Sequence, residues 1–256
     1  MKGKKVWKPY LLILLGLCMV VVLSSLKIGS SNASGRRQTA TIQSGIPVRS
    51  FARDAKVVGV EVQESDVRLT LSNGYHKTIT AFVVSSNGVI STTDMIDTDQ
   101  IVPPGGTVSG SYALPKSSSP QDALAVRAVM FEDGTADGDA TIIRKVLDTR
   151  AGQREQVTRI IPLLQAAVNG PVADLREQWR TIKSQFAALP DEEKGQSFAF
   201  NAGLRDAKNL AIHKISNLEM VHQERGDEIA RRILVHLKET NEERNRKLGM
   251  ALRRNQ

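Results

Sequence analysis

The stretch LAVRAVMFEDGTADGDATIIRKVL, residues 124–147, contains the main change of residue pattern in the chain. Seven of the eight residues in 124–131 are apolar, and this is the most strand-like run of the chain. After Asp139 the apolar residues recur at spacings of three and four, as they do on one face of a helix. The chain therefore changes here from strands to helices, which predicts an α+β protein.

Upstream of this change, short runs rich in β-branched residues alternate with turn residues. Asn87-Gly88 is a strong signal for a tight hairpin between two of these runs. The expected strands are residues 57–63, 67–71, 78–85, 89–92, 108–114 and 124–131. Many short strands separated by regular turn signals predict an antiparallel Ig-like β-sandwich over residues 56–140.

Downstream, helical spacing predicts an α-helical region over residues 141–256. A first helix should run to Asn169 with a kink near Arg159, because Pro162 removes one backbone hydrogen bond. A second helix should bury one apolar stripe, formed by Leu175, Trp179, Ile182 and Phe186. A third should extend from about residue 192 to 252 and is weakened, and open to a break, at Gly195, Gly203 and Gly226.

The segment KETNEERNRK, residues 238–247, has no apolar face. We expect this part of the third helix to project into solvent, held by pairs one turn apart such as Glu243–Lys247.

The N-terminus has the features of a membrane anchor. Four lysines, Lys2, Lys4, Lys5 and Lys8, precede an apolar run that extends over residues 10–28. This run would span about 28 Å as a helix, so residues 1–28 are interpreted as a signal anchor or signal peptide. The lysines favour a single-pass anchor in the cytoplasmic membrane with the rest of the chain extracytoplasmic. The alternative is cleavage near Ser31-Asn32-Ala33, which would leave a periplasmic or secreted protein.

Residues 29–55 are rich in Ser, Gly, Arg and Thr and show no sustained period, which indicates a flexible linker. Cys18, the one cysteine of the chain, lies inside the apolar run. The exported part therefore contains no internal disulfide.

The acidic stretch FEDGTADGD, residues 131–139, invites three interpretations. Asp133, Asp137 and Asp139 could be calcium ligands, but they are spaced four and then two apart, and no glutamate follows in register. They could be paired catalytic acids, but no apolar pocket is visible that would raise one pKa. Asp133-Gly134 and Asp137-Gly138 are good turn dipeptides directly after a strand, so a structural turn is favoured.

Other motifs give no catalytic, cofactor-binding or metal-ligating residue. None of the four histidines lies four residues from another, so no zinc-binding helix pair is present; they are His76, His213, His222 and His236. No phosphate-binding glycine loop and no nucleophile elbow occur in the sequence. We therefore expect neither an enzyme nor a cofactor.

Three segments are similar to exported bacterial proteins of uncharacterised function that join a small Ig-like or fibronectin-like sandwich to a helical tail. These segments are NGYHKTITAFVVS at 73–85, VPPGGTVSGSYALP at 102–115, and residues 124–139. The resemblance covers roughly residues 56–160. It implies a sandwich fold and an envelope location, and it implies no catalytic residue.

These features predict a non-enzymatic binding or scaffolding protein of the cell envelope. Its expected partners are the membrane, through residues 10–28, and a protein or a second copy, through the C-terminal helices. Residues 141–256 carry 21 basic and 15 acidic residues, a net charge of +6. The apolar stripe of the third helix also needs cover; it comprises Ile215, Leu218, Ile229, Ile233 and Leu237.

Two alternatives belong to other classes. One is a metal-dependent hydrolase that uses the turn from Asp133 to Asp139. The other is a basic helical module that binds anionic polymer or lipid. Nucleic acid is not expected as a partner outside the cytoplasm.

Overall fold

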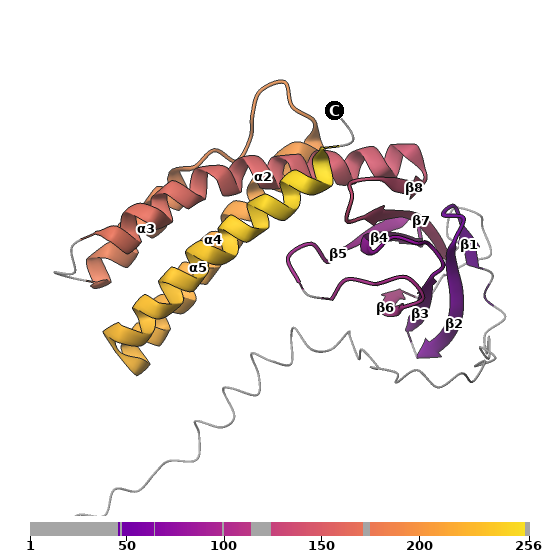
Figure 1. Cartoon of the computed structure of the whole chain (residues 1–256), viewed down its shortest axis with the longest axis horizontal. Helices are drawn as coiled ribbons and strands as arrows, with labels where there is room; N and C mark the ends of the chain where they lie inside the picture. The colour runs from indigo at the N-terminus through magenta and orange to yellow at the C-terminus, as the bar shows by residue number, and fades with distance from the viewer. Residues whose placement is uncertain are drawn as a thin grey trace, which may run out of the picture.

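The computed structural model describes residues 46, 48–63, 65–98, 100–113, 124–170 and 175–253. Strands occupy the first part of the described chain and helices the second, so the α+β prediction is confirmed. Figure 1 shows the sheets on one side of the molecule and the helical bundle on the other, with α2 reaching from one to the other. The predicted anchor, residues 10–28, lies outside the described residues.

The strands form two sheets. The first has the order β1-β7-β4-β5, and β8 also pairs with β7; the second has the order β2-β3-β6. The bounds are β1 Val48–Ser50, β2 Ala55–Gln63, β3 Asp66–Asn73, β4 Ile79–Ser86, β5 Val89–Asp94, β6 Thr107–Ala113, β7 Leu124–Phe131 and β8 Ala136–Gly138. All six strands expected from the sequence are present.

The sequence pattern does not predict β1 and β8, each three residues long. β1 lies in the segment interpreted as a flexible linker, and it pairs in parallel with the first half of β7. The first sheet is therefore mixed, and the prediction of a purely antiparallel sandwich is wrong at this edge. A run of three residues is too short to show a period of two, so its pairing depends on β7 rather than on its own pattern.

The two sheets face each other across a shared apolar core. Val67, Leu69 and Leu71 of β3 point into it, as their alternation predicts. β4 is buried on both faces, because α2 covers the side of the first sheet that faces away from this core. Between β4 and β5 the chain turns at Asn87 and Gly88, whose φ angles of 53° and 71° confirm a tight hairpin.

The helices are α2 (Ala140–Asn169), α3 (Leu175–Ala188), α4 (Phe198–Arg225) and α5 (Asp227–Leu252). α2 continues through Pro162 and is about 45 Å long at 1.5 Å per residue. The predicted stripe of α3 is buried in full. The long third helix is broken at Gly226, whose φ of 84° reverses the chain and makes α4 and α5 an antiparallel hairpin.

The prediction that residues 238–247 project into solvent is wrong. The turn at Gly226 sends α5 back along α2, so Asn241 and Arg244 are buried. Arg244 Nε lies 2.9 Å from Asp97 Oδ2 in the loop after β5. Glu243 pairs with Arg246, one turn away, rather than with Lys247.

The hairpin also divides the stripe of apolar residues expected on the third helix. Ile215, Leu218 and Leu237 are buried, whereas Ile229 and Ile233 near the turn are exposed. Among the described helices, none combines the length and the apolar character that crossing a bilayer requires.

Candidate functional site

The acidic turn is a hairpin between β7 and β8. Asp133 accepts hydrogen bonds from the backbone N–H (3.0 Å) and hydroxyl (2.6 Å) of Thr135. Lys77 Nζ lies 2.8 Å from its other oxygen. Partial burial acts to raise the pKa of Asp133, but the hydrogen bonds from Lys77 and Thr135 outweigh it and lower the pKa to about 2.

The other two carboxylates of the turn point to different neighbours. Asp137 Oδ2 accepts from the Tyr75 hydroxyl at 2.7 Å and from the Arg53 backbone N–H at 2.8 Å. Burial and the hydrogen bond to Asp137 together raise the pKa of Tyr75 to about 12. Asp139 is the N-cap of α2, where it accepts from the backbone of Thr141 at 2.9 Å, and it also pairs with Arg127.

The prediction that a turn follows the strand of residues 124–131 is thus confirmed. The structure brings no group of three or more metal-ligating side chains together among the residues it describes. That the turn binds no metal stays a prediction. Two of the four histidines, His213 and His222, contact Asn217 and Asp227, polar neighbours within five residues in sequence.

The acidic turn should contribute to the pH dependence of stability. The folded pKa of Asp133, about 2, lies below its ordinary value of 3.8. Its stabilising contribution is therefore complete above pH 3.8 and is lost as the pH falls through 2.

We expect Asp133→Asn to lose less stability than the unmodified chain between about pH 4 and pH 2 in urea unfolding. Asp66→Asn, at an exposed position of β3, is the control. Equal acid sensitivity of the unmodified and Asp133→Asn chains would contradict this assignment.

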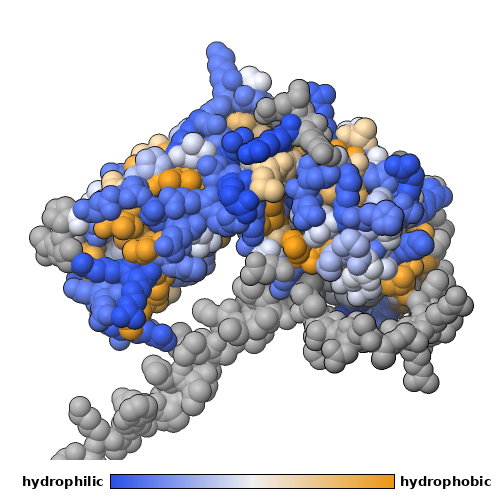
Figure 2. Space-filling model, in the orientation of Figure 1, coloured by the Kyte–Doolittle hydropathy of each residue, from blue (hydrophilic) through white to orange (hydrophobic). Residues whose placement is uncertain are grey.

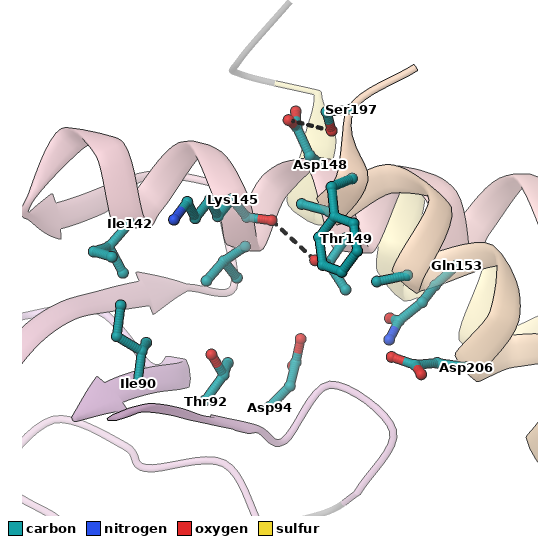
Figure 3. Close-up of a pocket in the computed structure, with 14 residues that line it drawn as sticks. Ile90, Thr92, Asp94, Ile142, Lys145, Asp148, Thr149, Gln153, Ser197 and Asp206 are labelled. Atoms are coloured by element: carbon teal, nitrogen blue, oxygen red, sulfur yellow. Dashed lines mark hydrogen bonds between the residues drawn. The ribbon is translucent and has the colours of Figure 1, made fainter. Parts of the chain in front are cut away.

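A different site, which the sequence did not indicate, lies where the sheets meet the helices. It is a cleft of about 640 Å³ between β5, the first half of α2 and the start of α4. Ile90, Thr92 and Asp94, alternate residues of β5, line one side of it, and Figure 3 shows Ile142 and Thr149 of α2 opposite them. A volume in this range is typical of ligand sites.

The cleft exists because β5 extends beyond the helix that covers its sheet. Ile142 and Val146 of α2 pack on Ala81 and Val83 of β4 and on the adjoining β7, which leaves the outer strand β5 uncovered. Two large apolar side chains of the cleft lining are exposed, namely Ile90 and Phe198, the latter with 82% of its surface accessible. Figure 2 shows hydrophobic surface where the helices meet the sheets as well as along the helical bundle.

Two glycines bring the helical walls together. A Cβ added at Gly203 of α4 would lie 2.0 Å from the Thr149 carbonyl oxygen of α2. A Cβ added at Gly152 of α2 would lie 2.0 Å from the Phe200 carbonyl oxygen of α4. The two backbones are therefore in direct contact at the end of the cleft, and this contact sets where Phe198 stands relative to β5.

The polar groups of the cleft differ between its two ends. In Figure 3, Ile90 and Ile142 lie at one end together with the ammonium group of Lys145, and Gln153 and Asp206 lie at the other. Asp206 is exposed and makes no ion pair with a described residue. Asp148, on the α2 wall, accepts a hydrogen bond from Ser197, the N-cap of α4, at 2.8 Å.

Asp94 anchors the floor of the cleft to α2. Its two oxygens accept hydrogen bonds from Arg150 Nε at 2.9 Å and Nη2 at 2.8 Å. The Arg150 side chain is fully buried, whereas that of Asp94 is 24% exposed and faces the cleft. The fourteen residues around the cleft include no histidine and no cysteine, and the charged ones among them are Asp94, Lys145, Asp148 and Asp206.

Comparisons of the chain with family models, with curated proteins and with solved structures find no match.

Proposed function

We propose that the chain is a non-enzymatic binding or scaffolding protein of the cell envelope, and that it takes its ligand in the cleft between β5, α2 and α4. The observation that carries this proposal is the exposed apolar lining, with Phe198 82% accessible beside the uncovered strand β5. Apolar side chains grouped around a concave surface mark a binding site more often than scattered exposed residues do.

The proposal includes the membrane. Residues 10–28 would anchor the chain in the cytoplasmic membrane, and the sheets and helices would lie on its outer side. The support is the lysine-rich start and the length of the apolar run. If the run were instead removed as a signal peptide, the same cleft would serve a periplasmic or secreted protein.

We also infer an Ig-like description of the two sheets. Four strand pairings support it: β2–β3, β3–β6, β4–β7 and β7–β8. They correspond to the pairings A–B, B–E, C–F and F–G of Ig-like sandwiches. Such sandwiches present binding surfaces on many exported proteins, although a fold alone does not fix a function.

The two alternatives have less support. For a hydrolase built on the acidic turn, Asp133, Asp137 and Asp139 would need to share one reaction site, yet each is engaged by a different set of neighbours. For a polyanion-binding helical module, the basic side chains would need to be free. Several are paired with acids instead: Arg150, Arg159, Arg205, Lys208 and Arg244.

Site-specific cross-linking in cells tests the proposal. A photoreactive phenylalanine analogue at position 198 of the full chain should give one defined adduct that sediments with the membranes. The same analogue at Val62, exposed on β2 of the other sheet, should not give this adduct. Adducts that are identical at both positions, or absent at position 198, would overturn the assignment of the cleft as the binding site.

A further inference from the structure

We propose that the cleft binds an extended polypeptide, which pairs as an additional strand with the outer edge of β5. This inference rests on the proposed function and names its ligand class. The peptide we infer carries an apolar side chain at one end of the cleft and a lysine or arginine at the other. Three features of the described residues lead to it, namely the strand edge, the side chains beside it and the charge at one end.

The first feature is the strand edge. β5 pairs with β4 on one side, and no described strand pairs with it on the other. An unpaired edge presents a row of backbone N–H and C=O groups at the spacing that an incoming strand requires. In β5 this row is six residues long.

β5 also lacks the features that keep an edge strand from pairing. It contains no proline and no lysine, and its register with β4 is regular from Val89 to Asp94. The outer strand β2, by contrast, has an irregular register at Val57/Gly59 and contains Lys56. β1 and β8, at the opposite edge of the first sheet, are each only three residues long.

The second feature is the row of side chains beside this edge. Ile90 and Thr92 point to the same side of the sheet and into the cleft, since side chains alternate along a strand. A peptide paired with β5 would also alternate, so every second side chain would enter the cleft. Ile90 and Ile142 would lie beside the apolar one.

The third feature is charge. Asp206 stands at the end of the cleft away from Ile90 and lacks an ion-pair partner among the described residues, and Asp148 lies on the neighbouring helix. Asp94, which lies nearer to this end than Ile90 does in Figure 3, is four residues from Ile90 along β5, about 13 Å in an extended strand. The complementary peptide therefore carries its basic residue four positions from its apolar residue, so that both enter the cleft.

The test is the binding of defined synthetic peptides to the full chain in detergent micelles. The probe peptide has isoleucine and arginine separated by three threonine or serine residues, and its binding is followed by fluorescence anisotropy. N-methylation of alternate backbone nitrogens is applied to two matched peptides, one blocking each edge. Methylation on the edge that pairs with β5 should weaken binding at least about tenfold, whereas methylation on the other edge should leave binding unchanged.

A charge swap tests the second half of the proposal. Asp206→Lys should weaken the binding of the arginine peptide at least about tenfold. The same variant should restore the binding of a peptide in which glutamate replaces arginine. Asp206 is exposed, so this variant should fold. Ile90→Lys, which places a charged side chain on the edge strand, should abolish the binding of both peptides.

The other outcomes are distinct. Equal effects of methylation on the two edges would overturn strand pairing. A chain that dimerises in light scattering, and loses the dimer on Ile90→Lys, would make a second copy the occupant and overturn a foreign peptide. No peptide binding, together with a defined adduct at position 198, would overturn the peptide while leaving the proposed binding function intact.

Discussion

Replacement of Gly203 by alanine should lower the free energy of unfolding by about 3 kcal/mol or more, a loss at the upper end for a single substitution. The new methyl group would lie 2.0 Å from the carbonyl oxygen of Thr149 and 2.9 Å from the backbone nitrogen of Gln153. Both contacts are with the backbone of α2, which has no rotamer by which to move away. The methyl group would therefore force α4 away from α2, along which the two helices pack extensively.

The control for this prediction is Gly249→Ala in α5. The atoms nearest to a Cβ there belong to the guanidinium of Arg154, from 3.3 Å, and this group lies at the end of a flexible side chain. Since alanine favours a helix over glycine by up to about 1 kcal/mol, the control should be neutral or slightly stabilising. Urea unfolding of both variants measures the difference. Equal stabilities of the Gly203→Ala and Gly249→Ala chains would show that the close approach of α2 and α4 at Gly203 does not contribute to the stability of the fold.

Gly203→Ala should also affect the cleft. α4 carries Phe198, Ala199 and Ala202 at the cleft wall, and the glycine contact holds this wall in position. A chain that still folds should therefore bind the probe peptide more weakly, at a temperature where circular dichroism shows it folded. Unchanged peptide binding in a destabilised but folded chain would show that the position of the α4 wall does not affect binding.

Alternation and turn residues predicted most of the sheets. Val67, Leu69 and Leu71 identified the inner face of β3, and Asn87-Gly88 identified a hairpin. These patterns succeed because they record local constraints, namely the two faces of a strand and the positive φ angles of a turn. β1 was not predicted because a strand of three residues depends on its partner β7, which is more than seventy residues away in sequence.

The helices were harder to place for a related reason. Gly203 and Gly226 looked alike in the sequence as weak points of one long helix. Gly226 indeed ends α4, but Gly203 lies inside α4 as the point where it touches α2. Helix propensity assigns the same cost to both, and the difference between them is set by tertiary contacts.

The cleft had no signal of its own in the sequence. Ile90 and Thr92 read as one face of a short strand, and Phe198 follows a stretch rich in polar residues. They become neighbours because α2 leaves β5 uncovered and α4 starts beside it. The acidic turn has a clear sequence signal because its carboxylates lie close together along the chain, although each of them makes separate structural contacts.

The second large loss of stability is expected at the ion pair between Asp94 and Arg150, beneath the cleft. Asp94→Ala should lower the free energy of unfolding by about 3–5 kcal/mol, because it leaves the guanidinium of Arg150 buried without its counter-charge. Arg150 has no accessible side-chain surface. Its remaining contacts, with the Thr80 carbonyl and hydroxyl at 3.4 and 3.3 Å, are long and carry no charge.

An exposed ion pair supplies the comparison. Arg232 and Glu228 of α5 lie 2.5 Å apart, with 76% and 79% of their side chains exposed. Water already solvates both charges, so Glu228→Ala should change stability by less than about 1 kcal/mol. A loss at Glu228 as large as that at Asp94 would mean that burial does not decide the strength of these pairs.

The double variant Asp94→Ala/Arg150→Met tests the cause of the stability loss in Asp94→Ala. If the loss in Asp94→Ala arises from an unpaired buried charge, removal of that charge should recover part of the stability, so the double variant should be more stable than Asp94→Ala alone. Arg150→Met by itself should cost less than Asp94→Ala, because Asp94 keeps partial exposure to water and its hydrogen bond from the Ile96 backbone at 3.1 Å. Urea unfolding of the four chains closes the cycle. A double variant less stable than Asp94→Ala would show that Arg150 stabilises the contact between α2 and the sheet through its packing rather than through its charge.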